Sequence, residues 1–250
     1  MCVTFVYLNA DAVDEKDYQL IVINNRDESY DRPTSYAAWE DGILAGKDEG
    51  IPNERGGTWL GVTKGGKVGV LLSMLQKQST LKPNAPTRGR ILNGYFKSKD
   101  SAAQYTEKLA QSANKFNCFN LVLLDRYTQR LLFWTEILTL WVYGFGNSPR
   151  SHPFRKVEHG TELFKECNED QLLLELVNIL RNDICHHPDN QLLSQTEQQE
   201  ECSKAMSQLF YSLPGSYRYG RAVFYEVSLY VPALPVTAWA TTKLQFTIDD

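Results

Sequence analysis

The sequence predicts an α+β fold with layered helices and largely antiparallel sheets. Strand-like stretches come first in the chain, helical patterns follow in the middle, and strand-like stretches return near the end. Such an order is typical of α+β layered domains. At 250 residues, 42% of them hydrophobic, the chain is long enough to bury a substantial core without disulfide support. This length suits one large domain or two small ones, and we predict a single domain over residues 1–250.

The first two predicted strands bring chemically active residues together. Residues 2–8 form a β-like run that opens on Cys2, and residues 18–24 form a second. If the two pair antiparallel, the Asn25-Arg26-Asp27 segment is expected to form a turn at the end of the sheet where Cys2 lies. A carboxylate and a guanidinium would then stand beside a thiol near the chain terminus.

Further strands are predicted around turn signals. Gly65-Gly66 separates arms at 58–63 and 67–72, and the second arm is apolar enough to be buried on both faces. A short apolar piece occupies residues 42–45. The other predicted strands are runs of apolar and aromatic residues at 119–124, 130–135, 138–143, 221–230 and 237–248.

Helices are predicted where apolar residues recur at helical spacing. The clearest run follows Asp170, a candidate N-cap, and continues to Leu180. Ser194-Gln195-Thr196-Glu197 has the pattern of a capping box and opens a polar helix to about residue 210. Two more helices are predicted at 101–115 and 161–167, and residues 76–90 read as a polar loop.

Composition excludes several classes of protein. A net charge of −4 argues against general nucleic-acid binding, which needs a basic face. No apolar run approaches the 18 residues or so of a membrane span, and the N-terminus lacks the pattern of a secretory or transit peptide. The five cysteines show no CxxC spacing, which favours a reducing, cytoplasmic environment without disulfides or a zinc site.

Cys2 allows a catalytic and a structural interpretation. Removal of the initiator methionine would give Cys2 both a thiol and a free α-amine, so one residue could supply a nucleophile and its base. Alternatively, Cys2 is a small apolar strand residue, and Asn25-Arg26-Asp27-Glu28 is a polar turn. The residue types alone favour the structural interpretation.

Several motifs occur in a characteristic order. They are Met1-Cys2, Asn25-Arg26-Asp27-Glu28 with Arg32-Pro33, Gly56-Gly57-Thr58-Trp59-Leu60-Gly61, Phe119-Asn120-Leu121 and Tyr143-Gly144-Phe145-Gly146-Asn147. In this order they resemble the transport and Golgi organisation protein 2 family, also called the NRDE family. The resemblance implies a four-layer αββα sandwich of the N-terminal-nucleophile hydrolase type.

The resemblance also implies roles for single residues. Cys2 would be the nucleophile, Arg26 and Asp27 would position it, Asn147 would stabilise an oxyanion, and Arg221 would be a late basic residue near the thiolate. Asn147 also suits a plain turn before Pro149.

Parts of the expected machinery are changed in this chain. Ser73 stands where relatives tend to place an asparagine, Phe145-Gly146 replaces a commoner pair, and the surroundings of Arg221 lack the expected threonine and serine. The catalytic residues are therefore candidates whose alternative is a vestigial site, and binding is favoured over efficient hydrolysis.

The candidate ligand-binding residues are Asn25, Arg26, Glu28, Trp59, Arg88 and Arg90. Arg88 and Arg90 flank a glycine, so two guanidiniums on one loop could hold the phosphates of an acyl-coenzyme A or the propionates of haem. A solvated loop is the alternative. Cys185-His186-His187 matches no common zinc spacing, and haem ligation by either histidine is a weaker hypothesis.

The resemblance implies an intracellular haem-trafficking protein that binds haem or acyl-coenzyme A and acts in haem and lipid homeostasis. Haem would be a cargo, and no cofactor is required. The alternatives are an N-terminal cysteine amidohydrolase or acyl thioesterase, and an interaction protein of the secretory pathway. We expect a cytoplasmic protein associated with the Golgi or mitochondria, with partners in the secretory pathway or mitochondrion.

Overall fold

The computed structural model describes residues 1–9, 18, 20–29, 32–50, 56–125, 131–133, 136–138, 141–196, 200–209, 219–221, 230–231 and 242–243. The chain forms two compact units, and it crosses between them several times. The first unit contains residues 1–31, 74–80 and 141–244, and the second contains residues 32–73, 81–140 and 245–250. Each unit is described by itself.

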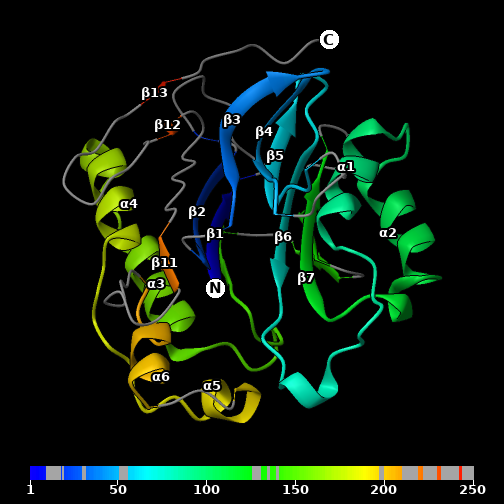
Figure 1. Cartoon of the computed structure of the whole chain (residues 1–250). Coiled ribbons are helices and arrows are strands. Elements are labelled where there is room, and N and C mark those ends of the chain that lie inside the picture. Colours follow the sequence, from blue (N-terminus) through cyan, green and yellow to red (C-terminus); the bar gives the residue numbers. More distant parts are fainter. Residues whose placement is uncertain are drawn as a thin grey trace. The chain divides into compact units, whose positions relative to one another are not determined.

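The first unit is built on a four-stranded antiparallel sheet in the order β10-β1-β2-β11 (Figure 1). Its strands are β1 (Cys2–Leu8), β2 (Leu20–Ser29), β10 (Trp141–Phe145) and β11 (Tyr219–Arg221). A separate two-stranded pair joins β12 (Tyr230–Val231) to β13 (Thr242–Lys243). β1 therefore lies between two partners, and its first residue is Cys2.

Helices cover one face of this sheet because alternate strand residues are apolar. Val3 and Phe5 of β1 and Ile21 and Ile23 of β2 point to the same side and are at most 5% exposed. They pack with apolar residues from the four helices of the described part of this unit, which are α3 (Arg155–Lys165), α4 (Leu172–Leu180), α5 (Asn190–Gln195) and α6 (Glu200–Met206).

Helix α3 approaches the sheet closely because glycines stand at the contacts. A Cβ added at Gly160 would lie 2.2 Å from Cζ of Phe5, and one added at Gly146 would lie 2.7 Å from Cγ2 of Val157. Side chains at these positions would push the helix off β1 and β10. The Gly144-Phe145-Gly146 run is thus a docking surface for α3, and it leads directly into Asn147.

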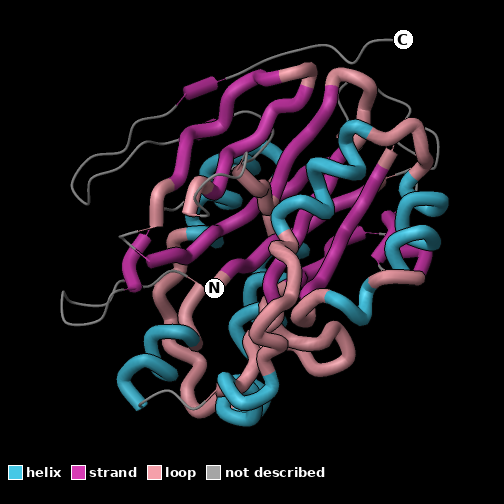
Figure 2. Tube along the Cα trace, turned by 45° about the vertical axis from the view of Figure 1, so that its right-hand side comes forward, coloured by secondary structure: helices cyan, strands magenta, loops and turns pink. Residues whose placement is uncertain are grey.

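The second unit is built on a seven-stranded antiparallel sheet in the order β3-β4-β5-β6-β7-β8-β9. Its strands are β3 (Thr34–Glu40), β4 (Ile43–Asp48), β5 (Leu60–Thr63), β6 (Val68–Ser73), β7 (Phe119–Leu124), β8 (Leu131–Phe133) and β9 (Glu136–Leu138). Helices α1 (Gly89–Lys97) and α2 (Ala102–Ala110) belong to the same unit. Leu92 and Phe96 of α1 pack against Gly69 of β6. Figure 2 distinguishes the strands from the helices in another view.

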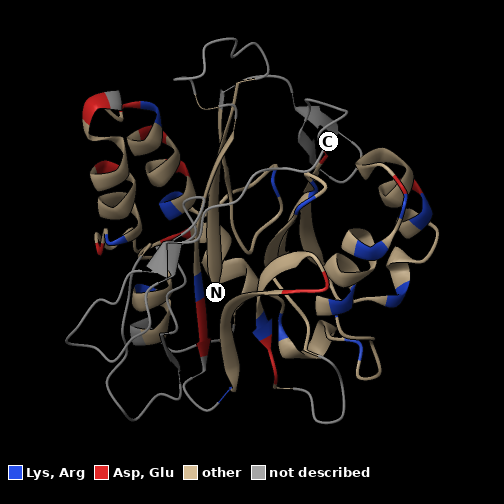
Figure 3. Ribbon diagram, turned by 90° about the horizontal axis from the view of Figure 1, so that it is seen from above, with Lys and Arg blue, Asp and Glu red and all other residues tan. Residues whose placement is uncertain are grey.

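The α+β class and the antiparallel sheets are confirmed, as are the strands around 2–8, 58–63, 67–72 and 119–124. The two larger antiparallel sheets, each with helices in its own unit, are the elements from which the predicted αββα sandwich is built. Most of 221–230 and 237–248 lies outside the described residues. Within the described residues, no helix has the length and apolar character needed to cross a bilayer. Lys and Arg are mixed with Asp and Glu on the helices (Figure 3).

Several boundaries were predicted wrongly. Asn25-Arg26-Asp27 is strand rather than turn, because β2 continues to Ser29 and pairs there with β11. Ser194 lies inside α5, where its hydroxyl donates to the Gln191 carbonyl, so it caps no helix. Gln171, not Asp170, precedes α4. Helix α3 begins at Arg155, earlier than predicted, and strand β3 was missed.

Candidate functional site

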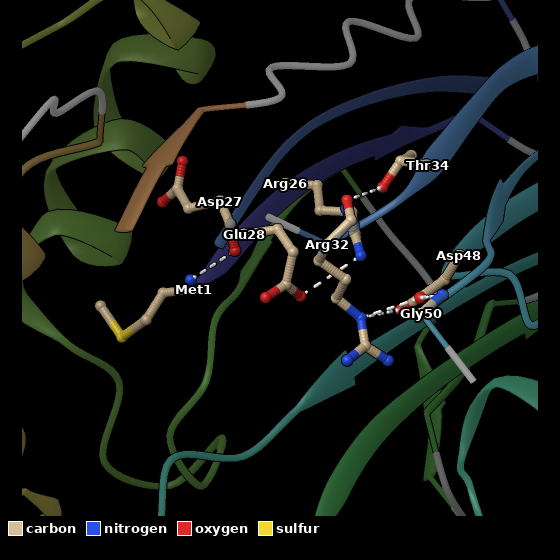
Figure 4. Close-up of polar contacts among 8 residues, drawn as sticks. All are labelled: Met1, Arg26, Asp27, Glu28, Arg32, Thr34, Asp48 and Gly50. Carbon is tan, nitrogen blue, oxygen red and sulfur yellow. Dashed lines mark hydrogen bonds and ion pairs between the residues drawn. The ribbon is translucent and has the colours of Figure 1, made fainter. Parts of the chain in front are cut away.

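Cys2 lies opposite Arg26, at the end of the β1–β2 ladder. The backbones of Met1 and Asp27 exchange two hydrogen bonds. The Met1 amine donates to the Asp27 carbonyl at 2.8 Å (Figure 4), and the Asp27 N–H donates to the Met1 carbonyl at 2.7 Å. The next pair, Cys2 and Arg26, is therefore a non-hydrogen-bonded pair, in which side chains stand closest. The predicted neighbourhood of the thiol and the guanidinium follows from this register.

Asn147 completes the other side of Cys2. Thr4 pairs with Phe145 on β10, and the same register continued by two residues places Cys2 opposite Asn147. At this position the Cys2 N–H donates to Oδ1 of the Asn147 side chain at 2.7 Å, where a backbone carbonyl would accept in a regular strand pair. The Asn147 carbonyl accepts from the Leu75 N–H at 2.8 Å and from Nε2 of Gln195 at 3.2 Å, which fixes the residue from behind.

The residues Asn25 to Glu28 alternate between the two faces of β2. Asn25 faces the helices: its Nδ2 donates to the carbonyls of Leu180 at 2.8 Å and Leu209 at 3.1 Å. These carbonyls end α4 and follow α6, where helices leave acceptors unsatisfied. Asn25 is thus a helix-holding residue, and its predicted contact with a ligand stays a prediction.

Arg26 and Glu28 lie on the opposite face, together with Cys2. Nη2 of Arg26 stands 3.2 Å from Oε2 of Glu28. The arginine side chain is 4% exposed and the glutamate side chain 31%. The inner partner of the pair is therefore the cation, and the outer partner is the anion. Figure 4 shows the Asp27 side chain pointing away from that of Arg26.

Thr4 and Asn24 extend this face into the sheet. Nδ2 of Asn24 donates to the Val3 carbonyl at 3.0 Å and to Oγ1 of Thr4 at 2.7 Å, so the amide orientation is fixed. Its Oδ1 is buried and finds no hydrogen-bond donor among the described residues. The face of the β1–β2 pair that carries Cys2 is thus polar, although the side chains of Thr4 and Asn24 are nearly inaccessible to solvent.

Lys156 is a charged residue that the sequence reasoning missed. It lies in the first turn of α3 with no exposed surface, and its Nζ donates to the Gln208 carbonyl at 3.0 Å. Burial lowers its pKa, and the nearby acidic groups, chiefly the Asp27 carboxylate, oppose that change. The helix side of the site therefore holds a desolvated cation near buried carboxylates. A signal existed, because Lys156 shares the buried stripe of α3 with Val157, Gly160 and Phe164.

Burial also raises the pKa of the Cys2 thiol. The terminal amine and Arg26 act in the opposite direction, whereas Asp27 and Glu28 reinforce the rise. With Met1 in place, the Cys2 nitrogen is a peptide nitrogen and cannot accept a proton. In this form the site holds a protonated thiol beside a buried guanidinium.

Arg221 is aligned with Asp27 across the β11–β2 ladder, so its backbone lies at the site. Its side chain is outside the described part of the structure. Cys2, Arg26, Asp27, Asn147 and the backbone of Arg221 are thus brought together in the first unit. Their catalytic roles stay predictions.

The other predicted ligand residues belong to the second unit. Trp59 is buried against Gly46, Nη1 of Arg88 donates to the Cys118 carbonyl at 2.9 Å, and Arg90 is exposed on α1. Gly89 is explained by packing, because a Cβ there would lie 2.8 Å from Cα of Gly57. The absence of a side chain at Gly89 therefore allows two backbone segments to approach each other. Ser73 ends β6 in the same unit.

The Cys185-His186-His187 run shows no metal site. The rings of His186 and His159 stand 4.7 Å apart, and the Cys185 thiol lies 3.3 Å from Oγ of Ser207. Among the residues that the structure describes, no three histidine, cysteine or acidic side chains gather as a metal centre.

Together, these features define an α+β protein with a cysteine at the end of a central antiparallel strand, flanked by an arginine, an aspartate and an asparagine. A model of the Transport and Golgi organisation 2 family matches residues 1–223. The chain belongs to that family.

Relatives agree with this assignment. The chain is 31% identical to the mouse Transport and Golgi organization 2 homolog over 76% of this chain and 75% of that protein. It is also 31% identical to the human Transport and Golgi organization protein 2 homolog, over the same shares. The Drosophila melanogaster Transport and Golgi organization protein 2 is 32% identical over 77% of this chain and 76% of its own length.

A solved structure is similar to a lesser degree. It is the Caenorhabditis elegans N-acylethanolamine-hydrolyzing acid amidase ortholog, with a TM-score of 0.37 and 10% identity over 72% of this chain and 85% of that chain. A similarity this low supports no conclusion about the activity of the chain.

Proposed function

We propose that the chain binds the acidic group of haem or of an acyl-coenzyme A on the face of β2 that carries Cys2, Arg26 and Glu28, and that it moves such ligands inside the cell. The observation that carries the proposal is the Arg26 guanidinium, which is 4% exposed beside Cys2. A buried guanidinium is a strong and oriented partner for a carboxylate or a phosphate.

The state of Cys2 favours binding over turnover while Met1 is present. The thiol pKa is raised by burial, so the thiolate fraction at neutral pH is small. The adjacent nitrogen is a peptide donor held by Asn147 at 2.7 Å. Family membership supports a role in intracellular transport, and within that role we propose haem as the first cargo. The cytoplasm is the proposed compartment, with the Golgi or mitochondria as destinations.

The test is titration of the purified full chain with haem and, separately, with palmitoyl-coenzyme A. We expect Kd below about 10 μM for at least one ligand, equivalent to ~7 kcal/mol of binding free energy. Arg26→Gln should weaken binding at least tenfold, while Arg181→Gln, an exposed arginine of the same unit, should leave it unchanged. Absence of binding by either ligand contradicts the proposal.

A second candidate function is hydrolysis of a small amide or acyl thioester, and the Cys2–Asn147 hydrogen bond favours it. After loss of Met1, Oδ1 of Asn147 would hold the new α-amine of Cys2 as it holds the peptide nitrogen here. The amine would take the thiol proton while sulfur attacks the acyl carbonyl. The leaving amine or thiol would depart with that proton, and water would release the acid from the acyl-enzyme.

Intact mass of protein from its natural source tests this second function. The hydrolase requires a mass without Met1, and turnover of an acyl thioester that Cys2→Ala abolishes. If Met1 is retained, or if Cys2→Ala leaves turnover unchanged, the hydrolase is excluded.

A further inference from the structure

We propose that Glu28 is a built-in occupant of the Arg26 anion site, which an acidic ligand must displace. The inference rests on the proposed function, because it concerns the same guanidinium. It makes the resting protein self-inhibited: the chain supplies its own carboxylate, and the ligand competes with it.

The register of β2 places the two groups for this role. Residues 26 and 28 are two positions apart on one strand, so their side chains leave the same face. Nη2 of Arg26 and Oε2 of Glu28 lie 3.2 Å apart. The glutamate side chain is 31% exposed against 4% for the arginine, so an incoming acid meets Glu28 first.

A second arginine–carboxylate pair in this chain has the geometry of a strong ion pair. Nε of Arg32 donates to both oxygens of Asp48, at 2.8 and 2.9 Å, and Oδ1 of Asp48 also accepts from the Gly50 N–H at 3.0 Å (Figure 4). Short, forked contacts of this kind are strong and geometrically specific. The contact between Arg26 and Glu28 is longer, at 3.2 Å, and its outer partner is partly exposed, which suits exchange.

Desolvation explains why the site keeps an internal anion. An arginine whose side chain is 4% exposed is costly to desolvate, and each carboxylate beside it offsets part of that cost. Glu28 is one such carboxylate in the resting protein, and the acid of the ligand takes its place in the complex. The charge beside Arg26 is then similar in both states, because one anion replaces another.

The consequence is a mutation that improves binding. Glu28→Gln removes the competitor but keeps the shape, so Kd for haem or palmitoyl-coenzyme A should fall about threefold to tenfold, as expected for loss of a partly exposed ion pair. Arg26→Gln should weaken binding. In the double variant Arg26→Gln/Glu28→Gln, the Glu28 substitution should give no gain in affinity, because the Arg26 guanidinium for which Glu28 competes is absent. Glu162→Gln, which removes an exposed ion pair with Lys165, is the matched control and should have no effect.

A readout without these ligands separates this inference from the proposed function. Alkylation of Cys2 by iodoacetamide should be faster in Glu28→Gln, because one of the carboxylates that raise the pKa of the Cys2 thiol is then removed. Inorganic phosphate should slow that reaction in Glu28→Gln far more than in the wild type.

The outcomes are distinct. If Glu28→Gln binds haem and palmitoyl-coenzyme A no better than the wild type, or worse, Glu28 is not a competitor and this inference is overturned, while binding itself stands. If neither ligand binds any variant but phosphate acts as described, the occupied anion site stands and the proposed function fails. Equal phosphate effects in both proteins overturn the inference.

Discussion

The two faces of β2 use the same four-residue run for different purposes. On the helix side, Asn25 holds the carbonyls of Leu180 and Leu209, and Asp27 lies near the buried Lys156. On the other side, Arg26 and Glu28 pair beside Cys2. The first face attaches the helices to the sheet, and the second is the candidate binding surface. Residues adjacent in sequence therefore differ in whether their loss should affect stability or binding.

Asn25→Ala tests the helix face and should have the largest effect on stability. It removes two buried hydrogen bonds and leaves two helix carbonyls without their donor, which should cost about 3 kcal/mol of unfolding free energy. Urea denaturation measures the loss. Asn178→Ala, an exposed substitution on α4, is the control. A loss below about 1 kcal/mol would show that Asn25 does not hold the helices.

Lys156→Met should come next, at about 2 kcal/mol, because it removes a buried cation that interacts with the buried carboxylates of Asp27 and Asp189. The double variant with Asp27→Asn should recover part of that loss if the two charges interact. Additive effects in the denaturation cycle would mean that Lys156 acts only through packing.

Arg26→Gln should change stability least, by less than about 1 kcal/mol, because its partner Glu28 remains partly solvated. Its effect should appear in ligand affinity instead. Thermal unfolding and titration of the same preparation check both statements. A large stability loss with unchanged affinity would reverse the roles that we assign to the two faces.

The pH dependence of Cys2 alkylation sharpens the comparison further. Because burial raises the pKa of this thiol, its reaction should require a higher pH in the folded protein than in the urea-unfolded chain. The protonated thiol favours the folded state, so this contribution to stability is lost as pH rises past the ordinary pKa of a thiol. Mass spectrometry of each cysteine against pH gives the two midpoints, and equal midpoints would contradict a desolvated Cys2.

Much of this site could be predicted from the sequence. The pairing of the first two strands was enough to bring Cys2 beside Arg26, and the order of the motifs singled out Asn147. The local preference of Asn25 and Asp27 for turns gave the wrong structure, because pairing with β1 at Asn25 and with β11 at Asp27 extends the strand through both. Because the predicted strand ended at residue 24, the sequence did not show that Asn25 and Glu28 lie on opposite faces of β2.

Lys156 could not be assigned because the predicted helix began too late to include it. The buried stripe of α3 would have included Lys156 had the helix been predicted from residue 155, but its partner, the Gln208 carbonyl, is far away in the sequence. The reason for Gly89 was hidden in the same way, since its neighbour Gly57 is far away in the sequence.

Protection of Cys2 by ligand is the most direct test of the central claim, which is that Cys2 and Arg26 share one binding face. Full-length protein is alkylated with iodoacetamide, with and without haem or palmitoyl-coenzyme A, and each cysteine is followed by mass spectrometry. We predict that the ligand that binds slows modification of Cys2 at least tenfold and leaves the exposed Cys185 unchanged, and that Arg26→Gln removes the protection. Saturating ligand that leaves the Cys2 rate unaltered would contradict the account.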